Sequence, residues 1–467
     1  MRRIIYILAV SLFSCSLATK DGEALPQLKV SENGRFLMTA DGDPFFWLGD
    51  TGWLLFSKLK REEAARYLDD RAGKGFNVVQ AMVLHSLDLV NIYGDSALVG
   101  GNVAMPCEKE GDSFADPEAY DYWDHVDYIL RLAEERGIYM ALVPVWGSNV
   151  RSGRVTREQA GTYATWLAQR YGDKTHVIWL NGGDTRGDRN TDIWDTIGHT
   201  LRLGAPDQLI TFHPFGRTRS SMWFHQADWL DFNMFQSGHR RYDQDDSDLG
   251  YGQDNWRYVE DDYGLLPVKP TLDGEPSYEG IPQGLHDPSQ PYWDADDVRR
   301  YAYWSVFSGA CGFTYGHSAV MQMHKPGDSD PAYGVREYWT EALDAEGARQ
   351  MQFLKELVLS QPFFDRIPDQ QLIAREQGAR YDYQVATRGE DYAFVYTHNG
   401  REISLHLDRM EGPLVKASWF NPRTGSQTLI GEFEAVGTLS FDPPGEVQDG
   451  QDWVLVLTSQ HPRHAPG

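Results

Sequence analysis

The sequence contains few cysteines and none of the common zinc-binding motifs. Its 467 residues include only Cys15, Cys107 and Cys311, too few for a disulfide framework in a chain of this length. Cys311 lies in an apolar segment and is interpreted as a small core residue. Neither a Cys-X-X-Cys pair nor a His-Glu-X-X-His motif occurs, so we expect no structural zinc, no other metal and no cofactor.

Basic residues are scarce compared with acidic ones. The chain has 43 Lys and Arg against 68 Asp and Glu, which gives a formal net charge of −25. A protein that binds phosphate groups needs a basic face, so this composition excludes nucleic acids and anionic surfaces as partners. The acidity is interpreted as a means of keeping an exported protein soluble.

The apolar run at the N-terminus is too short to span a bilayer. Met1-Arg-Arg3 precedes this run, Ile4 to Phe13, as in a bacterial secretory signal. Leu12-Phe-Ser-Cys15 resembles a lipobox, so residues 1–15 predict a lipoprotein signal with Cys15 lipidated. We therefore expect an exported protein of a Gram-negative bacterium, in the periplasm or on the outer membrane, with the lipid as its sole membrane contact. An ordinary cleaved signal is the alternative.

Short apolar runs then alternate with helical patterns from residue 26 to 361. This alternation is typical of a parallel sheet with crossover helices, and eight runs predict a (β/α)8 TIM barrel. The predicted strands are Phe45–Gly49, Asn77–Val83, Tyr139–Pro144, His176–Asn181, Gln208–His213, Leu230–Gln236, Pro267–Gly274 and Cys311–Tyr315. The predicted helices are Arg61–Lys74, Tyr122–Arg136, Tyr163–Tyr171, Ile193–Leu203 and Asp297–Phe307. A hairpin over Leu28–Met38, turning at Asn33-Gly34, is expected before the barrel.

One link in the barrel region has a different composition. Residues 237–266 are polar and acid-rich, with the run Asp243-Gln-Asp-Asp-Ser-Asp248, and are predicted to form a long loop that shapes the cleft. The acids could bind calcium, but their spacing departs from the EF-hand loop, so solvated carboxylates are favoured.

From about residue 362 to 460 the pattern changes to short alternating strands separated by Gly, Pro and Asn. This predicts an all-β sandwich domain after the barrel. Its expected strands include Tyr392–Tyr396, Ile403–Leu407, Ala417–Phe420 and Trp453–Leu457, with a turn at Asn421–Gly425. No internal repeat and no low-complexity linker occurs, so we expect the two domains to pack together.

Two acids close apolar strands in the barrel region. Asp184 ends His176-Val-Ile-Trp-Leu-Asn-Gly-Gly-Asp184, and Glu275 follows Val268-Lys-Pro-Thr-Leu-Asp-Gly274. Glycosidic cleavage needs one carboxyl group to protonate the leaving oxygen and another to attack or to activate water. In a barrel, these strand ends meet at the active face, which indicates a glycosidase. The alternatives are a helix N-cap for Asp184 and a structural role for Glu275.

Other polar and aromatic residues also follow predicted strands and are candidates for substrate binding. Sugars stack on aromatic rings and hydrogen-bond to polar side chains around a cleft. The candidates are Asp50, Trp53, His85, Trp146, His213, Gln236, His239, Tyr278 and His317. The histidines are scattered over separate strands rather than paired at zinc-binding spacing, so hydrogen bonding to sugar hydroxyls is favoured over a metal site.

Several segments together resemble glycoside hydrolase family 140. They are Asp41-Gly-Asp-Pro-Phe-Phe-Trp-Leu-Gly-Asp-Thr-Gly-Trp53, Gly75–Gln80, Trp179–Asp184, Asp273–Pro276 and the turn Trp419–Gly425. The resemblance covers nearly the whole chain. It implies an apiosidase acting on the plant cell-wall polysaccharide rhamnogalacturonan II, with Asp184 as general acid/base, Glu275 as nucleophile and retention of configuration. An Asp replaces the Asn-Glu pair of the commoner barrel glycosidases.

Two alternative functions remain open from the sequence. The same chemistry could act on another plant sugar, such as arabinofuranose. A non-catalytic glycan-binding lipoprotein is the other alternative, although a pure binder has no need for a matched pair of acids.

Overall fold

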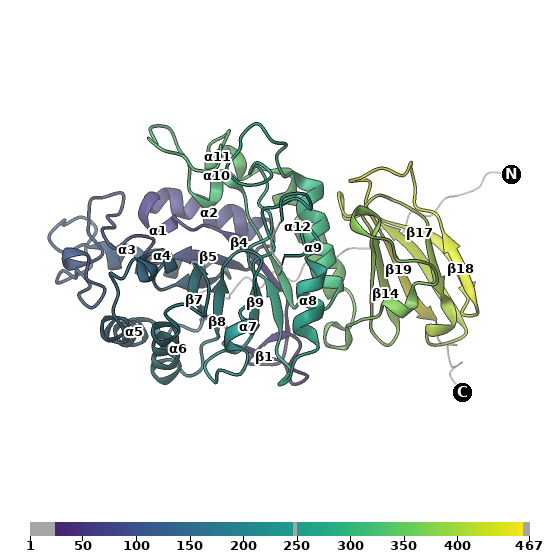
Figure 1. Ribbon diagram of the computed structural model, residues 1–467, viewed down its shortest axis with the longest axis horizontal. Helices are drawn as coiled ribbons and strands as arrows, with labels where there is room; N and C mark the ends of the chain where they lie inside the picture. The colour runs from purple at the N-terminus through teal and green to yellow at the C-terminus, as the bar shows by residue number, and fades with distance from the viewer. Residues whose placement is uncertain (1–23, 246–249, 461–467) are drawn as a thin grey trace.

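The computed structural model describes residues 24–245 and 250–460. Eight parallel strands form the barrel in the sheet order β8-β7-β6-β5-β4-β11-β10-β9. Between β8 and β9, the Asp231 N–H donates to the Ile210 carbonyl at 2.9 Å and the Thr211 hydroxyl to the Phe232 carbonyl at 2.6 Å. These bonds nearly close the ring, and the predicted TIM barrel is confirmed (Figure 1). The strands are β4 (Trp47–Thr51), β5 (Val78–Met82), β6 (Tyr139–Val143), β7 (Val177–Thr185), β8 (Ile210–Pro214), β9 (Asn233–Phe235), β10 (Thr271–Asp273) and β11 (Gly312–Tyr315).

All eight predicted strands overlap observed ones, although two boundaries differ in ways that matter. Phe45 belongs to β3 (Pro44–Phe45), which pairs with the N-terminal hairpin rather than with the barrel. The hairpin consists of β1 (Leu28–Val30) and β2 (Leu37–Thr39) and turns as predicted at Asn33-Gly34. The fourth predicted strand ended at Asn181, but β7 continues to Thr185. Asp184 therefore lies inside the strand rather than after it.

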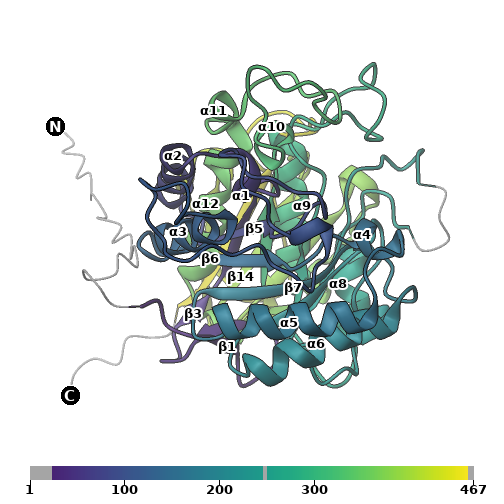
Figure 2. The ribbon, with the colours of Figure 1, turned by 90° about the vertical axis from the view of Figure 1, so that its left-hand side faces the viewer.

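Helices surround the strands. The longer ones are α2 (Arg61–Gly73), α3 (Tyr122–Glu134), α5 (Arg157–Tyr171), α6 (Thr191–Gly204), α8 (Trp256–Tyr263), α9 (Ala295–Phe307) and α12 (Glu346–Leu359). Short helices are α1 (Leu55–Lys58), α4 (Gly147–Arg151), α7 (Ser221–Phe224), α10 (Ser318–Met321) and α11 (Trp339–Ala342). Figure 2 shows α5 and α6 side by side on the outer surface of the barrel. No described helix is long and apolar enough to cross a membrane.

The prediction of an unbroken loop over residues 237–266 is wrong. Its second half contains α8, which buries Tyr258 and Val259 against Phe235 at the end of β9. The acids Glu260 to Asp262 make this helix resemble a polar loop in the sequence. In the acidic run, Asp243 pairs with Arg241, and residues 246–249 lie outside the described part of the chain.

The C-terminal domain is an antiparallel sandwich, as predicted. A six-stranded sheet has the order β12-β13-β14-β19-β16-β17, and β15 pairs with β18 in a second sheet. The strands are β12 (Ile367–Pro368), β13 (Gln384–Arg388), β14 (Tyr392–Thr397), β15 (Ile403–His406), β16 (Leu414–Phe420), β17 (Gln427–Glu434), β18 (Thr438–Phe441) and β19 (Trp453–Gln460). Val395, Leu405 and Leu455 are among the residues that fill the space between the sheets.

A buried ion pair and stacked rings join the two domains. Arg299 of α9 lies 2.8 Å from Asp452, which immediately precedes β19, and both side chains are almost fully buried. Tyr303, one turn along α9, stacks on Tyr396 of β14 with ring centroids 4.8 Å apart. Charged groups this deep in a protein are stable only when they are paired, so this contact fixes the sandwich against α9.

We predict that Asp452→Asn lowers the free energy of unfolding by roughly 3–5 kcal/mol, because it leaves Arg299 buried without a counter-charge. Chemical denaturation measures the change. Arg375→Ala is the control, since it breaks the exposed Arg375–Glu402 pair of the same domain and should cost under about 1 kcal/mol. Equal effects of the two substitutions would contradict the role of the buried pair.

Candidate active site

Asp184 is carried by an irregular end of β7. Gly182 and Gly183 have φ values of 96° and 98°, Asp184 has φ 44°, and the register with β8 shifts between Gly182 and Thr185. A Cβ at Gly183 would lie 2.5 Å from the Trp146 ring. Two glycines are therefore needed to turn the strand and bring it against Trp146. Since α6 begins at Thr191 after Asn190, Asp184 is not a helix N-cap.

Glu275 lies two residues beyond β10, with its carboxylate held by two imidazoles. Nε2 of His213 is 3.1 Å from Glu275 Oε2, and Nε2 of His239 is 3.3 Å from Oε1. The backbone N–H of Asp184 donates to Nδ1 of His213 at 3.2 Å. Because Nδ1 accepts, the proton of a neutral His213 is on Nε2, the ring nitrogen that lies closer to Glu275. One imidazole thus contacts both the Asp184 backbone and the Glu275 carboxylate.

The two acids have different protonation behaviour. Burial on its own would raise the pKa of Glu275, but the hydrogen bonds and charges of His213 and His239 outweigh it and lower the pKa to about 2. Burial raises the pKa of Asp184, and the charge of Glu275 raises it further, against opposing effects of His213, Arg151 and His239. Environments that separate the pKa values of a carboxyl pair assign the acid and base roles, with Glu275 the ionised member.

Three aromatic residues complete the cluster. The ring centroids of Trp53 and Trp146 lie 5.4 Å apart. Both rings contact His213, with centroid distances of 5.3 Å for Trp53 and 5.8 Å for Trp146. The buried Tyr278 ring lies edge-on to the His239 ring, with centroids 4.9 Å apart. Burial raises the pKa of Tyr278, and the charge of Glu275 raises it further. The structure thus brings together seven of the predicted site residues: Asp184, Glu275, His213, His239, Trp53, Trp146 and Tyr278.

The placement of Asp50 at the barrel mouth is wrong. Its side chain points outward from β4 to α2, where Arg71 Nε lies 3.0 Å away and the Tyr67 hydroxyl donates at 2.7 Å. Asp50 and Arg71 are both fully buried. Side chains alternate between the two faces of a strand, and Asp50 falls on the helix-facing side. This carboxylate is a structural group that cannot reach a substrate.

Three further candidates show no side-chain contact with the acid pair in the described structure. His317 caps α10 through the Ala319 N–H and pairs with Glu337 at 3.2 Å. His85 is half-buried, and its carbonyl accepts from Asn149. Gln236 is buried beside the main chain of Thr218. Within the described ranges, no group of three or more His, Cys, Asp and Glu side chains is arranged to hold a metal ion.

Two nearby residues were not found from the sequence. Arg151 of α4 donates to the Asp184 carbonyl at 2.8 Å. Tyr333 lies in the loop after α10, and the charges of Glu275 and Asp184 both contribute to raising its pKa, after burial. Neither residue follows a barrel strand directly, which is the signal used for the other candidates.

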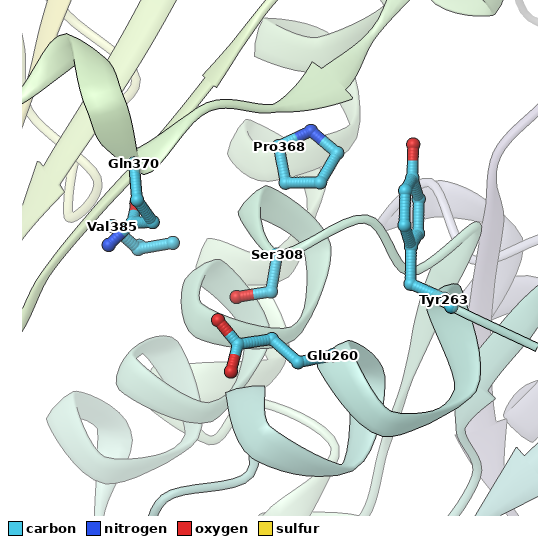
Figure 3. Close-up of a pocket in the computed structure, with 7 residues that line it drawn as sticks. Glu260, Tyr263, Ser308, Pro368, Gln370 and Val385 are labelled. Atoms are coloured by element: carbon cyan, nitrogen blue, oxygen red, sulfur yellow. The ribbon is translucent and has the colours of Figure 1, made fainter.

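A separate pocket of about 310 Å³ opens between the domains (Figure 3). It is lined by Glu260, Tyr263, Gly264, Ser308, Pro368, Gln370 and Val385. Glu260 is the one carboxyl group among these residues. The junction pocket therefore lacks the second acid that glycosidic cleavage needs.

With this geometry established, comparison with known proteins places the chain in a family. The model of the apiosidase-like catalytic domain matches residues 31–365. The chain belongs to the apiosidase-like family. A second model, "Putative collagen-binding domain of a collagenase", matches residues 367–458, so the sandwich of this apiosidase-like chain is itself a recurrent domain.

Two solved structures of glycoside hydrolases are similar to this chain over nearly its whole length. A structure described as a glycoside hydrolase is 44% identical, with a TM-score of 0.87, covering 93% of this chain and 97% of its own. A glycoside hydrolase family 5 protein from Bacteroides vulgatus is 43% identical, with a TM-score of 0.87 and 94% coverage of each chain. No curated protein matches the chain. The family and these structures support glycoside hydrolase function.

The lowered pKa of Glu275 makes a prediction about stability. Folding lowers this pKa from 4.5 to about 2, so the ionised carboxylate stabilises the folded state fully above pH 4.5 and loses this effect as the pH falls toward 2. Wild type should exceed Glu275→Gln in unfolding free energy by roughly 3 kcal/mol above pH 4.5. Denaturant unfolding of both proteins across this range measures the difference, and a pH-independent difference would contradict the assignment.

Proposed function

We propose that the protein is a retaining glycoside hydrolase that cleaves apiosyl linkages in the side chains of the pectic polysaccharide rhamnogalacturonan II. The observation that carries the catalytic part is that His213 contacts both the Glu275 carboxylate and the backbone N–H of Asp184, while the charge of Glu275 acts on the Asp184 carboxyl group. One acid is held ionised and the other has a raised pKa. Glycosidic cleavage needs this division of roles with either stereochemical outcome, and retention is the outcome that the family 140 resemblance implies.

In the first step, Glu275 attacks the anomeric carbon while Asp184, in its protonated form, donates its proton to the departing glycosidic oxygen. The bond from the anomeric carbon to that oxygen breaks, and a glycosyl ester on Glu275 forms. The low pKa of Glu275 keeps the nucleophile ionised across the pH range in which Asp184 can carry a proton.

In the second step, Asp184 removes a proton from water, which attacks the anomeric carbon and releases Glu275. Neutralisation of Glu275 in the ester also removes the charge that raised the pKa of Asp184. The pKa of Asp184 is therefore higher before the first step, when Asp184 must hold a proton, than after it. The fall in pKa allows Asp184 to change from acid to base.

His213 and His239 hold the nucleophile in position. Both direct Nε2 at the Glu275 carboxylate, one at each oxygen. The nucleophile is then fixed in orientation before substrate arrives, so little reorganisation is left for the transition state. Trp53 and Trp146, which pack on His213, supply apolar surface beside it.

The choice of apiose is supported by the apiosidase-like family match and by the family 140 resemblance. Asn181-Gly-Gly-Asp184 also departs from the Asn-Glu pair of the commoner barrel glycosidases. The Asn181 side chain donates to the Trp194 carbonyl at 2.8 Å, so it supports α6 rather than the acid pair. Action on another plant sugar with the same two acids is the second outcome that a substrate screen can return.

For the sandwich, we propose that it braces the barrel. The Arg299–Asp452 pair and the Tyr303–Tyr396 stack attach it to α9, whose C-terminal end leads into β11. The last barrel strand is thereby fixed from outside.

We also propose that the protein is exported and lipidated at Cys15, which lies outside the described residues. The lipobox-like segment supports this proposal. Cys15→Ser should abolish incorporation of labelled palmitate into the full-length protein made in a Gram-negative host, and should move it from the membrane to the soluble fraction. Unchanged labelling of the variant would contradict lipidation at this residue.

Substrates with different leaving groups distinguish the role of the nucleophile, Glu275, from that of the acid/base, Asp184. Glu275→Gln should lower sugar release at least about 10⁴-fold for every substrate, because no ester forms. Asp184→Asn should cost about 10²–10⁴-fold on rhamnogalacturonan II oligosaccharides, but far less in the first step on dinitrophenyl glycosides, whose leaving group needs no proton.

Asp188→Asn is the matched control, since Asp188 is a half-exposed acid of the same segment that pairs with Arg186. It should release sugar at the wild-type rate. If wild type is active and Glu275→Gln keeps that activity, the assignment of the nucleophile fails. If wild type releases no sugar from any pectic glycoside, the proposed activity fails.

A further inference from the structure

The loop after α10 is braced on both sides of Tyr333. The Gln322 side chain accepts from the Ala332 N–H at 2.7 Å and donates to the Ala332 carbonyl at 3.1 Å. The Tyr292 hydroxyl donates to the Gly334 carbonyl at 3.1 Å. The residues immediately before and after Tyr333 are therefore both fixed by side chains from other parts of the barrel.

The backbone of Tyr333 is in an unfavourable conformation. Its φ of 56° is in the left-handed region, which bulky non-glycine residues rarely adopt. Such conformations persist only where surrounding contacts impose them, and they occur often at functional sites. Gln322 and Tyr292 supply those contacts. Leu285, in the loop that follows Glu275, also has a positive φ of 81°.

The Tyr333 side chain packs beside the aromatic residues of the site and has an unpaired polar end. The residue is half-buried, and its ring lies 5.6 Å from that of His286. Its hydroxyl forms no hydrogen bond with any residue in the described part of the chain. Tyr333 packs against the hydrophobic cluster that includes Trp53 and Tyr278. His286, which its ring contacts, lies two residues after Gly284, whose N–H donates to the His239 carbonyl at 2.9 Å. The charges of Glu275 and Asp184 also contribute, after burial, to raising the pKa of Tyr333.

We propose that Tyr333 is a substrate-binding residue of this site, with its ring against the sugar that lies between Asp184 and Glu275 and its hydroxyl hydrogen-bonded to that sugar. The inference rests on the proposed glycosidase function and adds a specificity-determining residue from outside the strand ends. A half-buried aromatic ring with an unpaired hydroxyl is suited to a ligand that has both C–H faces and hydroxyl groups. A tyrosine that served only packing would need neither the imposed backbone conformation nor the free hydroxyl.

Four variants of the full-length enzyme test the proposal. Tyr333→Phe removes the hydroxyl alone and should lower kcat/KM about 3–10-fold, the value of one hydrogen bond. Tyr333→Ala also removes the ring and should lower it about 10–100-fold. Tyr292→Phe frees the Gly334 carbonyl and should give a smaller loss. Tyr128→Phe, on the outer helix α3, is the control and should match wild type.

Binding provides a readout that does not depend on turnover. In a Glu275→Gln background, calorimetry with apiosyl and arabinofuranosyl oligosaccharides should show weaker binding after Tyr333→Ala, with unchanged circular dichroism. If the wild type is active and Tyr333→Ala matches it in both kcat/KM and sugar binding, this inference is overturned and the proposed function is left intact. If the wild type shows no turnover and the Glu275→Gln protein binds no sugar, the proposed function and this inference are both overturned.

Discussion

The hydrogen bond from the Asp184 backbone to His213 is the constraint on which the site depends. It places the proton of a neutral His213 on Nε2, the ring nitrogen 3.1 Å from the Glu275 carboxylate, whose pKa His213 and His239 together lower. The bond forms because Gly182 and Gly183 turn β7 at its end, where a side chain at Gly183 would collide with Trp146. Backbone geometry on one strand thus controls the charge of an acid three strands away.

The negative charge of Glu275 in turn affects the pKa of Asp184. A buried carboxylate at Glu275 raises the pKa of its neighbour, while burial acts in the same direction. Two imidazoles, rather than an arginine, hold the Glu275 carboxylate. The two acids are therefore distinguished by what surrounds them. Both lie near the carboxyl ends of barrel strands, Asp184 within the end of β7 and Glu275 two residues beyond β10.

The sequence allowed the eight barrel strands to be predicted, because apolar periodicity is a local signal. Asp184 and Glu275 became candidates for the same reason, since each lies where an apolar segment ends. It gave the wrong role for Asp50, since the facing of one side chain depends on where β4 ends and on Arg71, which only the packed α2 brings near. The helix α8 was missed because its run of acids, Glu260 to Asp262, resembles a polar loop in the sequence. Tyr333 was missed because its position depends on braces at Gln322 and Tyr292, which have no periodic signature.

The most direct test of the account is to trap the covalent intermediate with an activated 2-deoxy-2-fluoro glycoside of the released sugar. The fluorine slows both steps, and the activated leaving group restores the first, so the glycosyl ester accumulates. Intact mass should rise by one glycosyl group, and peptide mapping should place that group on Glu275. A label on another residue, or turnover with inversion of the anomeric centre and no label, would contradict the retaining mechanism.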